Sequence, residues 1–109
     1  MKLKDIVEKL SLKVLTDIED KEVTGVYISD MLSDVMSNAQ AGNLWVTIQT
    51  HKNIVAAANL IDISAVIVSQ GTKVPDDTVE LANRYNVVIL STSDSTFALG
   101  AKLFQIGIK

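Results

Sequence analysis

The chain has no cysteine and only one histidine among its 109 residues. Without cysteine, neither a disulfide framework nor a thiolate metal site can form. A single histidine also excludes every metal or catalytic motif that needs two. These absences fit a reducing compartment, so we expect a cytoplasmic protein that holds no metal and no cofactor.

The chain is also poor in glycine, and its five glycines do not form a known phosphate-binding motif. None is followed by Lys-Ser or Lys-Thr, so the P-loop is missing, and so is the G-x-G-x-x-G fingerprint of dinucleotide sites. A G-x-S-x-G nucleophile elbow is absent as well. We therefore expect that the protein is not an enzyme and has no catalytic residues.

Basic residues are too few and too scattered to bind a polyanion. The ten lysines and arginines are outnumbered by thirteen acidic residues, and the net charge is −3. Nucleic-acid binding is not expected, since it requires a basic surface. No apolar run approaches the ~20 residues of a membrane span, so no membrane partner is expected. The charged start of the chain does not have the apolar core of a signal peptide.

The composition that remains, with 48% apolar and 21% charged residues, is typical of one globular domain over residues 1–109. Segments with helical periodicity alternate with short apolar runs, which predicts a layered α/β domain with a mainly parallel sheet. The runs at 65–68 and 87–90 are apolar throughout, as in strands buried on both faces. Strands are predicted at 11–15, 23–28, 44–48, 65–68 and 87–90, and helices at 3–10, 31–41, 52–60, 75–84 and 95–104, with Ser29 or Asp30 and Ser93 or Asp94 as caps of the second and last helices.

Polar residues follow three of the predicted strands. Ligands of open parallel sheets bind beyond the carboxyl ends of the strands, and free N–H groups at helix starts favour anions. We therefore expect a small polar or nucleotide-like ligand here, although ordinary caps and turns would give the same pattern. His51 is open to the same two interpretations, ligand contact or a hydrogen-bonded surface residue. The candidate contacts are Thr50, His51, Ser69, Gln70, Gly71, Ser91 and Thr92.

The last predicted helix and the residues after it are apolar around much of the circumference. A sheet covers only one side of such a helix, so the rest predicts a partner, most simply an identical chain. The residues assigned to this homodimer interface are Phe97, Leu99, Phe104, Ile106 and Ile108.

The segment Asp20-Lys21-Glu22-Val23-Thr24-Gly25 and its continuation through Ser33 resemble the signature of the DRTGG domain family. Residues 45–56 and 89–92 are similar to further stretches of that family, so the resemblance covers essentially the whole chain. Lys21 stands where arginine is usual, and Val26 where a second glycine can occur. Asp20, Lys21, Thr24 and Gly25 are candidate ligand contacts. For Asp20 and Lys21 the alternative is a solvated turn with a weak ion pair, and for Gly25 it is a requirement of the backbone.

The resemblance implies a three-layer α/β/α sandwich similar to the N-terminal domain of HPr kinase/phosphorylase. Family members are regulatory or assembly modules beside CBS domains in regulated pyrophosphatases and near phosphotransacetylase domains. Some stand alone near iron-only hydrogenase genes and are labelled serine kinases, a label that this chain, without a P-loop, does not support.

Three hypotheses follow. The first is a dimeric, non-catalytic module that regulates or assembles with a metabolic enzyme, such as a hydrogenase-related protein. The second is a sensor that binds an adenine nucleotide or another phosphorylated metabolite at the strand ends. The third is a minimal phosphotransferase that uses His51.

Overall fold

A computed structural model describes all residues from 1 to 109, and its centre is one five-stranded sheet with the strand order β1-β5-β4-β3-β2. Strands β2 to β5 are parallel to one another, and only β1 runs antiparallel, against β5. The predicted mainly parallel sheet is confirmed. The strands are β1 (Lys13–Val14), β2 (Gly25–Ile28), β3 (Asn43–Thr47), β4 (Ala65–Val68) and β5 (Ile89–Ser91).

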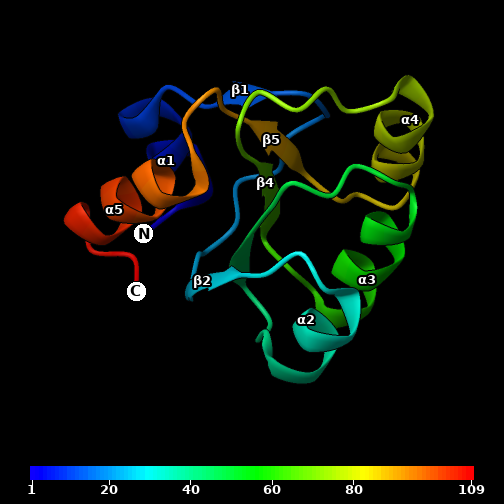
Figure 1. Ribbon diagram of the computed structural model, residues 1–109, viewed down its shortest axis with the longest axis horizontal. Helices are drawn as coiled ribbons and strands as arrows, with labels where there is room; N and C mark the ends of the chain where they lie inside the picture. The colour runs from blue at the N-terminus through cyan, green and yellow to red at the C-terminus, as the bar shows by residue number, and fades with distance from the viewer.

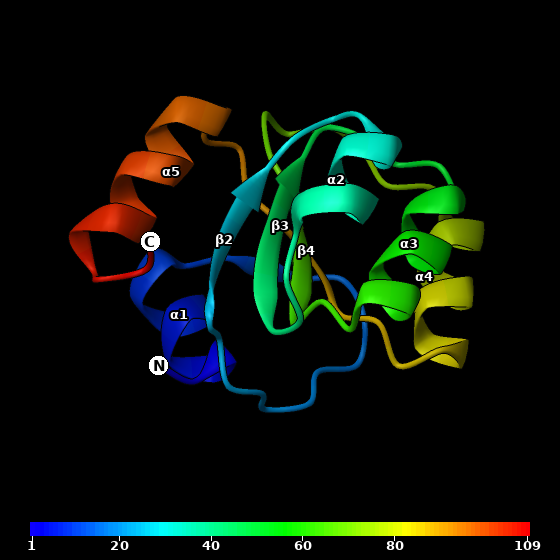
Figure 2. The same ribbon diagram turned by 90° about the horizontal axis from the view of Figure 1, so that it is seen from below.

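Helices cover both faces of the sheet. The strands β2 to β5 are laid down in sequence order in one direction, so right-handed connections place the helices between them on the same face. Figures 1 and 2 show α2, α3 and α4 on one side of the sheet and α1 and α5 on the other. The predicted three-layer α/β/α sandwich is therefore confirmed. The helices are α1 (Leu3–Leu10), α2 (Leu32–Asn38), α3 (Asn53–Ile61), α4 (Asp76–Arg84) and α5 (Thr96–Gln105).

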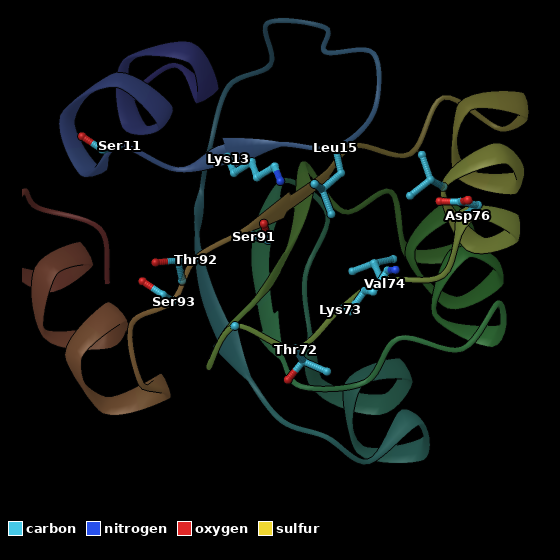
Figure 3. Close-up of a pocket in the computed structure, with 12 residues that line it drawn as sticks. Ser11, Lys13, Leu15, Thr72, Lys73, Val74, Asp76, Ser91, Thr92 and Ser93 are labelled. Carbon is cyan, nitrogen blue, oxygen red and sulfur yellow. The ribbon is translucent and has the colours of Figure 1, made fainter.

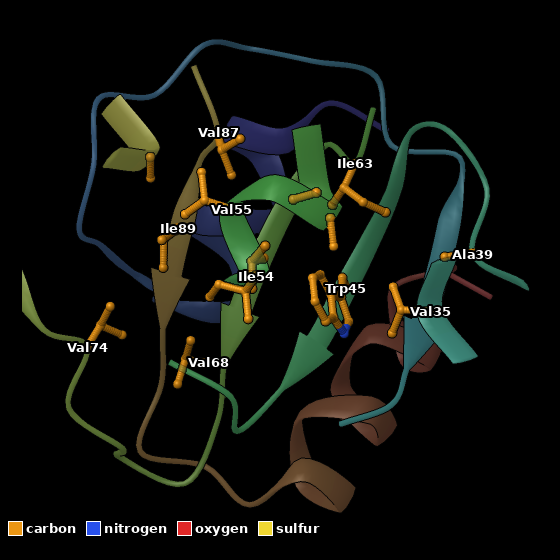
Figure 4. Packing of buried hydrophobic residues seen from close by; sticks show 14 residues of the cluster. Val35, Ala39, Trp45, Ile54, Val55, Ile63, Val68, Val74, Val87 and Ile89 are labelled. Atoms are coloured by element: carbon orange, nitrogen blue, oxygen red, sulfur yellow. The ribbon is translucent and has the colours of Figure 1, made fainter. Parts of the chain in front are cut away.

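Each face of the sheet has its own apolar core, because successive side chains of a strand point to opposite faces. On β3, Trp45 points into the core under α2, α3 and α4, whereas Leu44 and Val46 point into the core under α1 and α5. Figure 4 shows Trp45 packed beside Ile54 and Val35 in the first of these cores. Every residue of β4 is buried, as its continuous apolar run predicts.

Two helices begin differently from the prediction. Helix α5 is capped by Ser95, whose Oγ accepts a hydrogen bond from the Ala98 N–H at 3.1 Å, and not by Ser93 or Asp94. Helix α2 follows Met31 and has no side-chain cap. The Asp30 carboxylate instead accepts hydrogen bonds from the end of β3, so it ties two strand ends together.

The α5 region contradicts part of the predicted dimer interface. Leu99 faces the sheet and is 0% exposed, and Ile108 is buried as well. The helix ends at Gln105 and the chain turns at Gly107, whose φ is +96°, so Ile108 folds back onto the core under α1 and α5. Ile106 is half-buried against that core. Only Phe97 and Phe104, which are 87% and 63% exposed, remain as surface residues of the predicted set.

None of the five helices has the length and apolar character that crossing a membrane requires.

Candidate functional site

The connections that leave β4 and β5 diverge. The loop after β4 leads to α4 on one face of the sheet, whereas the loop after the neighbouring β5 leads to α5 on the other face. Neighbouring parallel strands whose connections part in this way leave a crevice at their carboxyl ends, which is where open α/β sheets bind ligands. The topology therefore places a candidate site between these two loops.

A hollow of about 750 Å³ lies at this place, within the size range of small-molecule sites. Four parts of the chain form it, namely the segment around β1, the β4–α4 loop, the first two turns of α4 and the β5–α5 loop (Figure 3). No helix follows β5 on this face, so the surface beside α4 stays open. The lining residues are Ser11, Lys13, Leu15, Gly71, Thr72, Lys73, Val74, Asp76, Val79, Ser91, Thr92 and Ser93.

Three of the predicted ligand contacts, Gly71, Ser91 and Thr92, line the hollow. Gln70 and Gly71 have φ values of +65° and +66°, and the Thr72 N–H points back to the Ser69 carbonyl at 3.4 Å, which is the pattern of a type I′ turn. A Cβ on Gly71 would approach nothing nearer than the Ser93 Cα at 4.0 Å. Glycine is therefore favoured here by its backbone conformation and not by lack of space.

The two loops are joined by backbone hydrogen bonds. The Gln70 N–H donates to the Asp94 carbonyl at 2.7 Å, and the Gly71 N–H donates to the Thr92 carbonyl at 2.9 Å. These bonds hold the β4–α4 loop against the β5–α5 loop. The two loops at the rim of the hollow are therefore held in place without a ligand. Such preorganisation favours affinity, because less conformational entropy is lost when a ligand binds.

The other predicted contacts at the strand ends do not line the hollow. Ser69 is 0% exposed, and its Oγ lies 2.7 Å from Thr96 Oγ1. The Thr50 carbonyl accepts a hydrogen bond from the Thr78 hydroxyl at 2.8 Å, and the His51 Nδ1 accepts one from the Asn53 N–H at 3.3 Å. These contacts match the alternative interpretation of ordinary capping and turn residues.

The residues at 20–25 lie at the opposite end of the sheet from the hollow, beside the amino ends of the parallel strands. Gly25 opens β2 and pairs with Asn43 at the start of β3, so it marks the amino ends of the parallel strands. The Asp20 carboxylate accepts a hydrogen bond from the Lys4 N–H at 3.1 Å, and the Lys21 ammonium donates to the Asn86 carbonyl at 3.3 Å. These residues therefore lie away from the hollow at the strand carboxyl ends, and their role as ligand contacts stays a prediction.

Thr24 and Gly25 complete this end of the sheet. The Thr24 hydroxyl donates to the Ala41 carbonyl at 2.9 Å and accepts a hydrogen bond from the Asn43 side chain at 3.2 Å. A Cβ on Gly25 would lie 2.9 Å from the Lys109 carbonyl oxygen. The signature segment thus joins α1, the start of β3 and the last residues of the chain, which is a structural role.

The hollow holds charged residues that sequence reasoning missed. Lys13 on β1 and Lys73 in the β4–α4 loop take part in no ion pair and no side-chain hydrogen bond, whereas Lys52 and Lys102 are each paired with an aspartate. One signal for Lys73 was present, since it follows Ser69–Thr72 directly. Lys13 gave none, because only the pairing of β1 with β5 brings it here.

These residues define the chemistry that the hollow can perform. Two free ammonium groups and the hydroxyls of Ser91, Thr92 and Ser93 can hold an anion with many hydrogen-bond acceptors, such as a phosphate group. The Asp76 carboxylate at the start of α4 adds one acceptor for ligand hydroxyl or amino groups. Across the chain, no three His, Cys, Asp or Glu side chains are grouped to hold a metal ion.

The resolved pKa shifts belong to a separate cluster between β2 and α2. The Tyr27 hydroxyl lies 2.9 and 3.0 Å from the two Asp34 carboxylate oxygens, and the Asn38 amide donates to Oδ1 at 2.9 Å. Hydrogen bonds from Ser29 and then Tyr27 lower the pKa of Asp34. The hydrogen bond to Asp34, followed by desolvation, raises the pKa of Tyr27. This cluster does not touch the hollow and stabilises the entry into α2.

Comparison with known proteins places this fold. One solved structure contains the CBS and DRTGG domains of the regulatory region of Clostridium perfringens pyrophosphatase, complexed with the activator diadenosine tetraphosphate. It superimposes with a TM-score of 0.73 at 19% identity, over 94% of this chain but only 46% of that one. The likeness shows the shared fold. No curated protein matches the sequence. Residues 5–106 match the DRTGG domain family, and the chain therefore belongs to that family.

Proposed function

We propose that the chain is a non-catalytic regulatory module that binds a small phosphorylated ligand in the hollow at the carboxyl ends of β4 and β5. The observation that carries the proposal is the pair of free lysines, Lys13 and Lys73, on the lining of a preformed hollow. An ammonium group without a protein partner keeps its full attraction for an incoming anion. The chain as a whole is acidic, so these local cations do not reflect a general excess of lysine.

The similar pyrophosphatase structure supports a regulatory role. Its two domains belong to a regulatory region and are complexed with a nucleotide activator. This chain spans less than half of that region. We therefore include in the proposal that this chain regulates a metabolic enzyme as its partner. A hydrogenase-related protein is one such partner.

The lining residues do not favour catalysis. His51 lies outside the hollow, and no lining histidine or cysteine could act as a nucleophile or general base there. The one lining carboxylate, Asp76, makes no hydrogen bond to the hydroxyls of Ser91 and Thr92 and lies at the other end of the hollow from Thr92 (Figure 3). Binding without turnover is therefore the function that the site supports best.

Isothermal titration calorimetry tests the proposal. Pyrophosphate, triphosphate, ADP and ATP are titrated into the protein at low salt and again at high salt. We expect binding by at least one of them, and a loss of about tenfold in affinity in Lys13→Met and in Lys73→Met. Lys4→Met removes the same charge from α1, outside the hollow, and serves as the matched control. No binding by any phosphorylated compound would refute the proposal.

A second candidate function, assembly through a homodimer, rests on the exposed phenylalanines of α5. Phe97 and Phe104 are large apolar side chains in solvent, and Ile28 at the end of β2 and Met31 just before α2 are exposed too. Buried aromatic side chains are common anchors of interfaces. Sedimentation at micromolar concentration would show a dimer that Phe97→Ser and Phe104→Ser convert to monomer. A monomeric wild-type protein would exclude this function.

A further inference from the structure

The hollow has two chemically different ends. Thr92 and Ser93 on the β5–α5 loop form one end, and Val74 and Asp76 at the start of α4 form the other, with Lys13 and Ser91 between them (Figure 3). This separation follows from the fold, because α4 and α5 lie on opposite faces of the sheet. One end therefore offers hydroxyls, and the other offers an apolar wall with a carboxylate and with Lys73 beside Val74.

A bare polyphosphate does not use the second end. The Asp76 carboxylate takes part in no ion pair and no side-chain hydrogen bond, and it would repel a second anion. It is suited to accept hydrogen bonds from uncharged donors, as acidic residues do from ribose hydroxyls in nucleotide sites. The neighbouring Leu15, Val74 and Val79 provide apolar surface for an uncharged ring.

We propose that the phosphorylated ligand is a nucleoside phosphate that spans both ends of the hollow, an inference that rests on the proposed function. The phosphates bind Lys13 and the hydroxyls of the β5–α5 loop, and Lys73, which lies beside Val74 in Figure 3, offers a further cation to the end of the phosphate chain that joins the nucleoside. The nucleoside packs on the apolar wall, and its sugar hydroxyls donate to Asp76. Asp76 is thus the residue that distinguishes a nucleotide from a simple polyphosphate.

The test compares ligands of similar charge. ADP and pyrophosphate both present two linked phosphates, but only ADP carries a nucleoside. We expect ADP to bind about tenfold more tightly than pyrophosphate or more, because only ADP satisfies Asp76 and covers the apolar wall. Adenosine, which lacks phosphate, is expected to bind weakest. Each titration is run with magnesium and again with EDTA.

The decisive variant is Asp76→Asn. It should weaken ADP about tenfold, because the amide is a poorer acceptor than a carboxylate, while pyrophosphate binds as well as before or more tightly. Asp77→Asn is the matched control, since Asp77 has the same charge in the same turn but pairs with Lys52 and lies outside the hollow. Circular dichroism checks that both variants fold, and Val79→Ala provides a second readout that should weaken ADP alone.

The outcomes separate the two proposals. Equal affinities for ADP and pyrophosphate, with Asp76→Asn acting on both alike, would overturn the nucleoside inference and leave the phosphorylated-ligand module standing. No binding of either compound would refute the module and the inference together. Selective loss of ADP in Asp76→Asn and Val79→Ala, with pyrophosphate binding retained, supports both.

Discussion

Lys13 lies directly opposite Ser91 in the antiparallel pair of β1 and β5. This pairing joins the first strand of the chain to the last and sets a lysine beside a hydroxyl at the carboxyl end of the parallel sheet. The edge strand has only two residues, so its main consequence is the placement of Lys13 rather than a large gain in hydrogen bonding. The pairing of β1 with β5 therefore gives the hollow the positive charge of Lys13.

The lysines of the hollow should not contribute to folding. Lys13→Met and Lys73→Met are expected to change the free energy of unfolding by no more than about 0.5 kcal/mol, because neither ammonium has a protein partner. Urea unfolding followed by the fluorescence of Trp45, the only tryptophan, measures this. Lys102→Met, which removes a 2.7 Å ion pair with Asp94 at the surface, should cost up to about 1 kcal/mol. Losses of several kcal/mol for the hollow lysines would show a structural role instead.

Replacement by alanine should reduce the free energy of unfolding far more at Leu99 than at Phe97, although both residues lie on α5. Leu99→Ala leaves a cavity in the core under α5 and is expected to lower the free energy of unfolding by about 2–5 kcal/mol. Phe97→Ala removes a side chain that is 87% exposed and should change the monomer by about 0.5 kcal/mol or less. Thermal and urea unfolding of both variants provide the comparison, and equal losses would contradict the burial described above.

Gly42 is the glycine whose replacement should cost most. Its φ is +84°, and an added Cβ would lie 2.7 Å from the Thr24 side chain, so Gly42→Ala combines backbone strain with a clash. We expect a loss of about 3 kcal/mol in unfolding free energy. Gly107→Ala, with φ of +96° but nothing within 4 Å, isolates the strain and should cost about 1 kcal/mol. A larger effect at Gly107 than at Gly42 would show that the clash does not matter.

Replacement of Gln70 by asparagine should raise the stability of the chain without weakening ligand binding. It is a non-glycine residue at φ +65° in the first central position of a type I′ turn, where asparagine or glycine is preferred. Gln70→Asn is therefore expected to raise the free energy of unfolding by about 0.5 kcal/mol. Gln70 does not line the hollow, so ligand affinity should stay the same in a parallel titration. Destabilisation would indicate that the glutamine side chain has a role of its own.

The Tyr27–Asp34 cluster should make stability depend on pH at both extremes. The pKa of Asp34 is lowered in the folded chain, so its contribution is present above the unfolded carboxyl pKa and is lost as pH falls through the folded value. The pKa of Tyr27 is raised, so its contribution is present below the unfolded phenol pKa and is lost as pH rises through the folded value.

Tyr27→Phe tests this linkage. It removes the phenol that titrates in base and one donor to Asp34, so the variant should lose less stability than wild type both on acidification and in strong base. Denaturant midpoints across the pH range measure the difference. Parallel curves for wild type and Tyr27→Phe would show that the pair does not contribute.

Local patterns in the sequence predicted most of the elements. The continuous apolar run at 65–68 and the helical periodicity at 3–10 correspond to β4 and α1 at their observed bounds. Such patterns are reliable because side-chain burial repeats with the period of the element itself. The ends of elements were less predictable, as Ser95 shows, since several neighbouring polar residues can cap the same helix.

The sequence by itself determined the family, the alternation of helices and strands and the absence of the known phosphate-binding motifs, because each is written in contiguous residues. Only the tertiary structure decided which residues share a site. It placed the segment around Gly25 at the amino ends of the parallel strands, set Lys13 opposite Ser91, and put Lys13 and Lys73 on the lining of one hollow. It also turned Leu99 into the core and Phe97 into solvent, because the phase of a helix on a sheet depends on where the preceding loop lets it begin.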